Sequence, residues 1–342
     1  MTALSQSRRN GPVRLEDVAR RAGVSPITVS RALREGTVVA KTTRKRVLAA
    51  AEELGYTPNL LARGLVENRT ATVGVVIVEV ANPFFAPMVS AVEAVSARRG
   101  FLVVIGESAR NEEWERKYVE RFQQMRVSGI IVTPARKRPD HLAALRKNGT
   151  PVVVMSRRWE EGDYITADNA AGGRMAARHL LSRGHRRIGL ITHVGPMDTS
   201  FEDRLRGFRQ VLASAAVSVP PVWEVRAKTT GIEDGFDAAD QIATLSKRPT
   251  AIFATTDRMA MGLVQRLLAH GIRVPENIAV VGYDDIPFAA CSRVPLTTVS
   301  IPVRQVGQLA AELLFDRMEG KGPRERQQIL LAPEFVIRAS CP

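Results

Sequence analysis

The pattern of apolar residues divides the chain into two parts. Up to residue 57, apolar positions recur three and four residues apart, a spacing that places them on one face of an α-helix. From residue 71 onward, short runs rich in Val and Ile alternate with longer stretches of helical periodicity. The sequence therefore predicts a small all-α domain followed by a larger α/β core.

Three short helices are predicted in the first part. Gly23 ends the first helix, because glycine adopts the left-handed conformation of a helix end without strain. Ser25 can cap the second helix, in which Pro26 takes the first position, and Gly55 ends the third. The apolar stripes expected to share one core are Leu15, Val18, Ala19 and Ala22; Val29, Ala32 and Leu33; and Val47, Ala50, Ala51 and Leu54.

The first two helices and their tight turn indicate a helix-turn-helix, whose second helix can lie in the major groove of DNA. The outward face of that helix carries Ile27, Ser30, Arg31 and Arg34. Arg31 can bind guanine through two hydrogen bonds, and Ile27 can contact a thymine methyl group. Ser30 or Arg34 can hold phosphates. The alternative is that Arg31 is an ordinary solvated arginine.

Residues 59–65 are predicted to form a helix that is marginal in water, because the segment is short and contains Gly64. We expect it to become helical only on DNA. Asn59 and Arg63 of this segment are further candidates for DNA contact. A plain linker between domains is the alternative.

The second part predicts two doubly wound parallel sheets with a ligand cleft between them. Its expected strands are residues 73–78, 101–106, 129–133, 151–156, 187–192, 251–256 and 278–283, with a last one in 334–338. The division we predict is a headpiece (1–57), a hinge and linker (58–70) and a core (71–342). Within the core, one subdomain spans about 71–169 plus 301–330, and the other spans about 170–300 plus 331–342.

Ligands of such sheets bind beyond the carboxyl ends of the strands. The candidates at those ends are residues 82–85, residues 156–158, Asp168, His193, Thr256, Asp257, Tyr283 and Asp284. For the aromatic side chains, packing in the core is an equally good interpretation from spacing alone.

The segments LEDVARRAGVSPITVSRAL and TRKRVLAAAEELGYTPNLLARGL resemble the DNA-binding headpiece of the lactose-repressor/galactose-repressor family. GHRRIGLI, DRMAMG, RVPENIAVVGYDD and PLTTVSIP resemble its effector-binding core, which has the periplasmic sugar-binding-protein fold. The resemblance covers nearly the whole chain. It implies that Pro26, Ile27 and Arg31 face bases and that Leu65 inserts between base steps in the minor groove. The chain departs from the family at Arg14 and Ala40, where oxygen-bearing residues usually start helices.

The resemblance also implies effector contacts from Phe84, Phe85, Arg204 and Asp284, with Asp257 similarly placed. Ser156 and Thr256 depart from the acidic or amide residues that many sugar-binding members carry. Arg157 and Arg158 instead offer guanidinium groups, which suit carboxylate or phosphate. We therefore expect an anionic effector, such as a sugar acid like gluconate or a phosphorylated sugar; a neutral sugar or a nucleobase is the alternative.

Charge adds support for a polyanionic partner. The formal net charge is +14, and residues 1–69 hold 13 Lys and Arg against 6 Asp and Glu. Half of the excess therefore lies in a fifth of the chain, as expected for a DNA-binding headpiece. A solvated basic surface would give the same charge counts. The prediction of DNA binding therefore rests on the helix-turn-helix motif, and the charge is consistent with it.

Several classes of protein are disfavoured. The chain has no phosphate-loop, dinucleotide or hydrolase motif, so neither an enzyme nor a cofactor is predicted. Cys291 and Cys341 indicate neither a disulfide nor a zinc site. No apolar run could span a bilayer or serve as a signal peptide, so we expect a cytoplasmic protein and not a secreted solute-binding one.

The predicted function is a transcription regulator, most simply a repressor, that binds double-stranded operator DNA under control of a small-molecule effector. A homodimer is expected because a palindromic operator needs two half-sites. We expect no tetramer, because only residues 339–342 follow the last predicted strand and cannot form a heptad helix.

Overall fold

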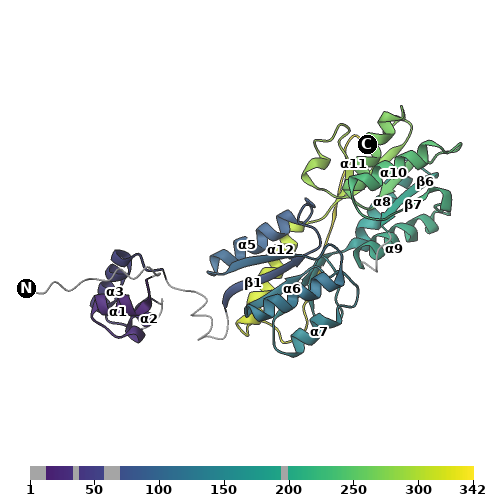
Figure 1. Ribbon diagram of the computed structural model, residues 1–342. Helices are drawn as coiled ribbons and strands as arrows, with labels where there is room; N and C mark the ends of the chain where they lie inside the picture. The colour runs from purple at the N-terminus through teal and green to yellow at the C-terminus, as the bar shows by residue number, and fades with distance from the viewer. Residues whose placement is uncertain (1–12, 34–37, 58–69, 194–198) are drawn as a thin grey trace, which may run out of the picture. The chain divides into compact units, whose positions relative to one another are not determined.

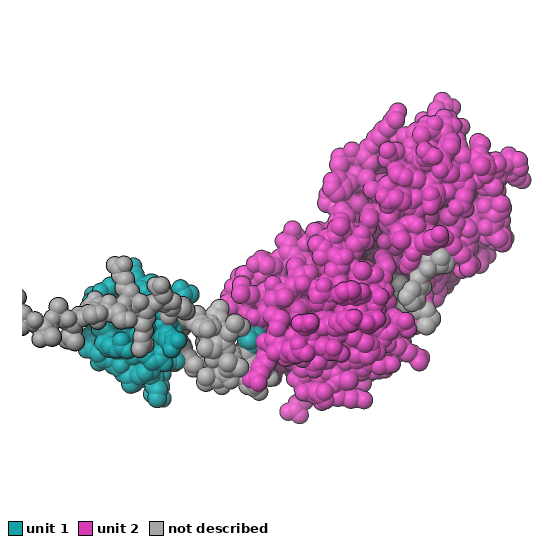
Figure 2. Space-filling model, in the orientation of Figure 1, with its two compact units in different colours: residues 1–70 teal, residues 71–342 magenta. Residues whose placement is uncertain are grey.

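The computed structural model describes residues 13–33, 38–57, 70–193 and 199–342. The chain forms two compact units, residues 1–70 and residues 71–342 (Figure 2). Each unit has a hydrophobic core of its own. In the described part of the chain, no helix has both the length and the apolar character needed to cross a membrane.

The first unit contains the three predicted helices, α1 (Leu15–Ala22), α2 (Pro26–Ala32) and α3 (Lys41–Leu54). Gly23 ends α1 in the left-handed conformation, with φ of 62°. The Ser25 hydroxyl caps α2 by accepting a hydrogen bond of 3.2 Å from the Thr28 amide. The three stripes meet in one small core, in which Val18, Val29 and Val47 are completely buried.

The second unit has two lobes (Figure 1). The sheet of the first lobe has the strand order β11-β5-β4-β3-β1-β2. Its strands are β1 (Thr70–Ile77), β2 (Leu102–Glu107), β3 (Val127–Val132), β4 (Val152–Met155), β5 (Asp163–Ala167) and β11 (Gln328–Leu331). Its helices are α5 (Ala86–Arg98), α6 (Glu112–Gln124), α7 (Asp140–Lys147) and α12 (Val303–Met318).

Helices cover both faces of this first sheet. Alternate residues of a strand point to opposite faces, so a single strand contacts helices on both sides. On β1, Val75 and Ile77 belong to the cluster that includes residues of α5 and α12. Val76, between them, packs with residues of α6 and α7. The strand pairs β1–β2, β3–β4, β4–β5 and β5–β11 are parallel. A central strand buried on both faces reads as a continuous apolar run, which is why β1 was predictable.

The sheet of the second lobe has the order β12-β10-β9-β8-β6-β7. Strand β12 runs antiparallel to β10, whereas the pairs β9–β10, β8–β9, β6–β8 and β6–β7 are parallel. Its strands are β6 (Ile188–His193), β7 (Glu224–Ala227), β8 (Ala251–Ala254), β9 (Ala279–Asp284), β10 (Thr297–Ser300) and β12 (Glu334–Val336). Its α-helices are α8 (Asn169–Ser182), α9 (Thr199–Ser214), α10 (Ile232–Ala243) and α11 (Asp257–Ala269). Short 3₁₀ helices span Pro221–Trp223 and Pro287–Ala289.

The chain crosses between the lobes at three places. The crossings follow β5, β10 and β11 and lead into α8, α12 and β12 respectively. Each lobe is therefore built from separate stretches of sequence. This architecture confirms the predicted fold class of two parallel-sheet lobes with an all-α headpiece. Strands β5, β7, β10 and β11 were not predicted.

Candidate functional site

The exposed face of α2 is the candidate DNA-reading surface. The side chain of Ile27 is 66% exposed and is therefore available for contact with a partner. Pro26 and Arg31 are exposed and Ser30 is half-buried, whereas Val29 on the opposite side is buried. These four predicted residues therefore share the face directed away from the headpiece core. The other predicted DNA contacts, Arg34, Asn59, Arg63 and Leu65, lie outside the described residues.

Local contacts differ at the starts of the headpiece helices α1 and α3. Arg14 carries no oxygen that could cap α1, but its backbone amide donates a hydrogen bond of 3.0 Å to the Asp17 carboxylate. Asp17 thus supplies the half of a capping box that reaches back to the first residue. Ala40 makes no side-chain cap at the start of α3. Arg46 of α3 donates to the Ala22 carbonyl at 2.7 Å, which ties α3 to the end of α1.

Arg204 lies at the centre of a polar cluster in the second lobe. It is 4% exposed, and its Nε donates to the Asn169 side-chain oxygen at 3.0 Å. One Nη donates to the Thr255 carbonyl at 2.6 Å, and the other lies 3.1 Å from the Asp284 carboxylate. The guanidinium also lies 3.7 Å from the centroid of the Tyr283 ring. The structure thus brings Arg204, Asp284 and Tyr283 together, as expected for candidates at the strand ends.

Two predicted residues of the cleft have strained backbones. Asp284, which ends β9, has φ of 115°, and Ser156, which follows β4, has φ of 63°. Residues other than glycine rarely adopt such angles, and they persist only where surrounding contacts enforce them. Such strain concentrates at binding and catalytic sites. The Asp284 and Ser156 backbones therefore mark the ends of β9 and β4 as candidate sites.

A second polar cluster lies where the end of β4 meets the first turns of α9. The buried Ser200 hydroxyl donates to the Ser156 carbonyl at 2.8 Å. Arg157 donates from Nη1 to the same carbonyl at 2.8 Å and lies 3.3 Å from the Ser200 hydroxyl. Arg158 is held by the Asp203 carboxylate, with contacts of 2.8 and 3.0 Å.

Helix α9 joins these two clusters. Ser200 and Arg204 are four residues apart, so they lie on one face of the helix. Ser200 contacts the first lobe, and Arg204 contacts the strand ends of the second. A small rotation of α9 would therefore change both clusters together.

Thr256 and Asp257 are engaged in supporting the structure. The Thr256 hydroxyl caps α11 by accepting a hydrogen bond of 3.3 Å from the Met259 amide. The fully buried Asp257 carboxylate accepts from the Thr298 hydroxyl at 2.6 Å and from the Ile286 amide at 2.9 Å. Burial, reinforced by the charge of Asp284, holds the pKa of Asp257 well above its usual range. Asp257 fixes the turn that carries Asp284.

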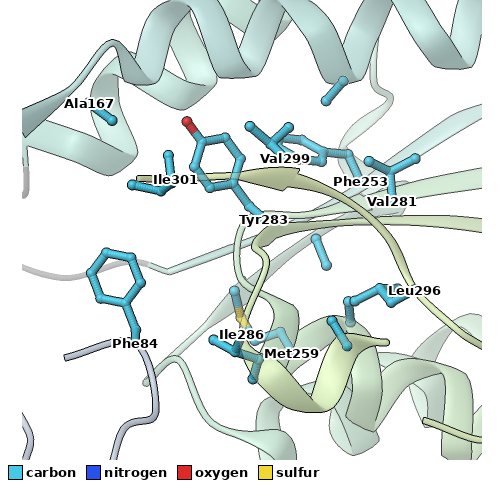
Figure 3. Packing of buried hydrophobic residues seen from close by; sticks show 14 of the residues in the cluster. Phe84, Ala167, Phe253, Met259, Val281, Tyr283, Ile286, Leu296, Val299 and Ile301 are labelled. Atoms are coloured by element: carbon cyan, nitrogen blue, oxygen red, sulfur yellow. The ribbon is translucent and has the colours of Figure 1, made fainter. Parts of the chain in front are cut away.

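The aromatic candidates lie on the first-lobe side. Phe84 and Phe85 are buried and meet edge to face, with ring centroids 5.2 Å apart. The Asn82 side chain accepts a hydrogen bond of 3.1 Å from the Phe84 amide and so fixes the loop before α5. Figure 3 shows Phe84 in one buried cluster with Tyr283 and Ile286 of the second lobe. Phe84 is therefore part of the contact between the lobes.

Further ion pairs and hydrogen bonds join the two lobes. Arg258 of α11 donates to both carboxylate oxygens of Glu79 at 2.9 Å. Lys137 lies 2.9 Å from Glu202, and Arg110 donates to the Thr230 hydroxyl at 3.1 Å. A cavity of about 250 Å³ has Lys137 in its lining, together with Arg158 and Thr199. The lobes are thus held by charged groups that a ligand in the cleft could rearrange.

Several of these contact residues were not predicted from the sequence. Asn169 follows the predicted candidate Asp168 directly, so its strand-end position was an available signal. Ser200 and Asp203 lie inside a helix and give no signal without the fold. Glu79 and Arg258 are 179 positions apart, and their pairing depends on the two-lobe topology.

Comparison with known proteins gives matches to both units. Residues 14–59 match the model of bacterial regulatory proteins of the lacI family, and residues 177–341 match a periplasmic binding protein-like domain. The HTH-type transcriptional repressor PurR of Photobacterium profundum is 37% identical over 331 residues, covering 95% of this chain and 98% of that protein.

Solved structures give matches of similar extent. A Lac repressor dimer bound to operator and the anti-inducer ONPF has a TM-score of 0.87 and 28% identity, covering 97% of this chain and 99% of that one. A complex of the transcriptional regulator CelR with cellobiose has a TM-score of 0.69 and 33% identity, covering 96% and 99%.

Proposed function

Because the chain belongs to the lacI family of bacterial regulatory proteins, we propose that it represses transcription by binding a palindromic operator as a homodimer under control of a small-molecule effector. It is a DNA-binding regulator and not an enzyme. The observation that carries the proposal is the exposed face of α2, with Ile27 and Arg31 presented by a separately packed headpiece. Such a protein acts in the cytoplasm, where the bacterial chromosome lies.

We assign the parts of the chain as follows. Residues 1–57 read the operator, residues 58–70 connect and couple, and residues 71–342 bind the effector and dimerise. The proposed DNA contacts are Pro26, Ile27, Ser30, Arg31, Arg34, Asn59, Arg63 and Leu65. Helix α2 supplies the base contacts, and positive charge in the headpiece supplies phosphate contacts.

The effector site lies between the lobes, at the ends of β4 and β9. Its proposed residues are Phe84, Phe85, Ser156, Arg157, Arg204 and Asp284, with Thr256 and Asp257 as supports. Arg204, Ser200 and the strained ends of the strands support this placement, because a ligand there would contact both lobes at once. A ligand that contacts both lobes can shift the equilibrium between their arrangements.

The pairing of the arginines favours a neutral effector over the anionic one expected from the sequence. Arg158 already pairs with Asp203, and Arg204 already pairs with Asp284. An anionic ligand would compete with both carboxylates for these guanidinium groups. We therefore propose the alternative, a neutral ring compound that is either a nucleobase or a sugar. The relative's name PurR favours the nucleobase, whereas the CelR complex contains cellobiose.

Two measurements test the proposed function. Selection from random duplexes should enrich palindromic sites, and enrichment of asymmetric or single-stranded sequences would contradict a dimeric repressor. A thermal-shift screen should compare free nucleobases, neutral sugars, sugar acids and phosphosugars. A stabilising neutral ring compound that also changes operator affinity supports the effector class. Stabilisation by sugar acids or phosphosugars alone would restore the anionic interpretation.

A further inference from the structure

A cavity of about 240 Å³ at one edge of the first sheet is lined by four arginines, Arg146, Arg317, Arg324 and Arg326. We call it the arginine cavity. Its other lining residues include Thr150 and Val152, at the start of β4, and Gly162 and Asp163, at the start of β5. It therefore lies at the amino-terminal edge of the sheet. The proposed effector site lies beyond the opposite, carboxyl edge, so the two sites are distinct.

The charge of the arginine cavity is not balanced by its own lining. Among the described residues that line it, Asp163 alone is acidic, and Arg317 binds both of its carboxylate oxygens at 2.8 and 2.9 Å. Arg326 donates to the Glu160 carbonyl, which is a neutral acceptor. Within the described part of the chain, the side chains of Arg146 and Arg324 make no hydrogen bond or ion pair. Two guanidinium groups are thus left to face the cavity without a counter-charge.

The size and chemistry of the cavity define the class of ligand. Pockets for organic ligands usually have about 300–1,000 Å³, so this one suits a smaller group. Several arginines around a small space provide paired N–H donors that match the oxygens of a phosphoryl group. The fixed Arg317–Asp163 pair gives the cavity a rigid wall between the C-terminal end of α12 and the start of β5. We propose that the arginine cavity binds a phosphate-type oxyanion through Arg146 and Arg324.

Such an oxyanion has two possible sources. One is a free phosphorylated compound, which would make the cavity a second ligand site. The other is the DNA backbone, because β1 begins at Thr70 on the same edge of this sheet. Both sources present the same phosphoryl oxygens, and experiment can separate them.

The first arm of the test measures binding of inorganic pyrophosphate to the full-length protein by calorimetry at low salt. Arg146→Gln with Arg324→Gln should weaken pyrophosphate binding about tenfold or more, the scale of charge-assisted hydrogen bonds. The exposed Arg178→Gln on α8 removes a positive charge elsewhere and should leave binding unchanged.

The second arm measures affinity for duplex DNA against salt concentration, with the same variants. If DNA supplies the phosphate, the double variant should lower the slope of log affinity against log salt by about 0.9 for each phosphate that it no longer neutralises. A free phosphorylated ligand is indicated when only the pyrophosphate arm responds. The proposal is overturned if neither arm responds, or if Arg178→Gln has the same effect as the double variant.

Discussion

Arg258 donates to both carboxylate oxygens of Glu79 at 2.9 Å and so links α11 of the second lobe to the end of β1 in the first. The two side chains are 20% and 31% exposed, which places the pair between a solvated surface ion pair and a buried one. Such a pair can stabilise one arrangement of the lobes without locking it.

The first prediction concerns this link. Glu79→Gln and Arg258→Gln should each loosen the lobes, with a coupling energy of about 1 kcal/mol between them, because the pair is charge-assisted and partly shielded from water. A double-mutant cycle on urea unfolding measures the coupling, and small-angle scattering should show a larger radius of gyration. The exposed pair Glu113–Lys117 within α6 serves as the control and should couple more weakly. Zero coupling between Glu79 and Arg258 would contradict a role for the pair.

The second prediction concerns base reading. Arg31→Ala should reduce discrimination between operator and unrelated DNA by about 1–3 kcal/mol, the value of one bidentate contact to guanine. Fluorescence anisotropy with both duplexes gives the ratio. Arg20→Ala removes an exposed arginine of α1 and should leave the ratio nearly unchanged. An equal loss of affinity for both duplexes in Arg31→Ala would mean that Arg31 holds phosphate instead.

The third prediction concerns the packing of α8 against α9. A Cβ placed on Gly173 would lie 2.0 Å from the Arg204 carbonyl oxygen, so Gly173→Ala must push the helices apart. We expect a loss of about 1–3 kcal/mol in the free energy of unfolding, measured in urea, and weaker effector binding because Arg204 moves. Arg178→Ala on the exposed side of α8 should change stability by less than about 0.5 kcal/mol. An unaltered free energy of unfolding in Gly173→Ala would show that α8 and α9 can move apart without loss of stability.

The fourth prediction concerns the buried carboxyl of Asp257. Its folded pKa is raised, so between about pH 4, the unfolded value, and that raised pKa the folded protein holds more protons than the unfolded one. The stability contribution is complete below about pH 4 and falls as pH rises through this window. Asp257→Asn is a neutral isostere that can accept from the Ile286 amide through its oxygen and donate from its NH2 group to the Thr298 hydroxyl. It should remove that decline in urea unfolding measured from pH 5 to 8.

A control for this pH effect is Asp240, whose pKa is lowered to about 2, first by a hydrogen bond from Arg266. Its contribution is lost only as pH falls below about 4, so Asp240→Asn should leave the slope between pH 5 and 8 unchanged. If the stability of Asp257→Asn declines with pH as steeply as that of the unmodified protein, the Asp257 carboxyl is charged in the folded state.

The elements that the sequence predicts well are those whose signals are local. Ser25 and Gly23 mark helix ends within a few residues, and α1 and α2 follow those marks. The central strands β1 and β3 each contain a short run of buried Val, Ile and Gly residues, at 73–77 and 129–132. Strand β7, with Glu224 and Arg226 in it, alternates at the edge of its sheet and carries no such run. Strand β11 is short and half exposed. It is a strand because it pairs with β5, which lies far from it in the sequence.

The candidate site divides in the same way. Asp284 and Ser156 could be located from the sequence, because topology alone places the strand ends at the cleft. The sequence could not show that Thr256 caps a helix or that Asp257 holds a turn, since both roles depend on their neighbours in space. Nor could it show that Arg158 meets Asp203, the contact on which our proposal of a neutral effector rests.

The three crossings between lobes have a consequence for biosynthesis. The edge strand β11 of the first lobe comes from residues 328–331 and β12 of the second lobe from residues 334–336, so neither sheet can be completed until those residues have been synthesised. The headpiece, with its own small core, can fold as soon as it leaves the ribosome. A growing chain can therefore carry a folded headpiece before the two-lobed unit is complete. Premature termination before residue 328 would release a fragment that contains the headpiece but lacks β11 and β12.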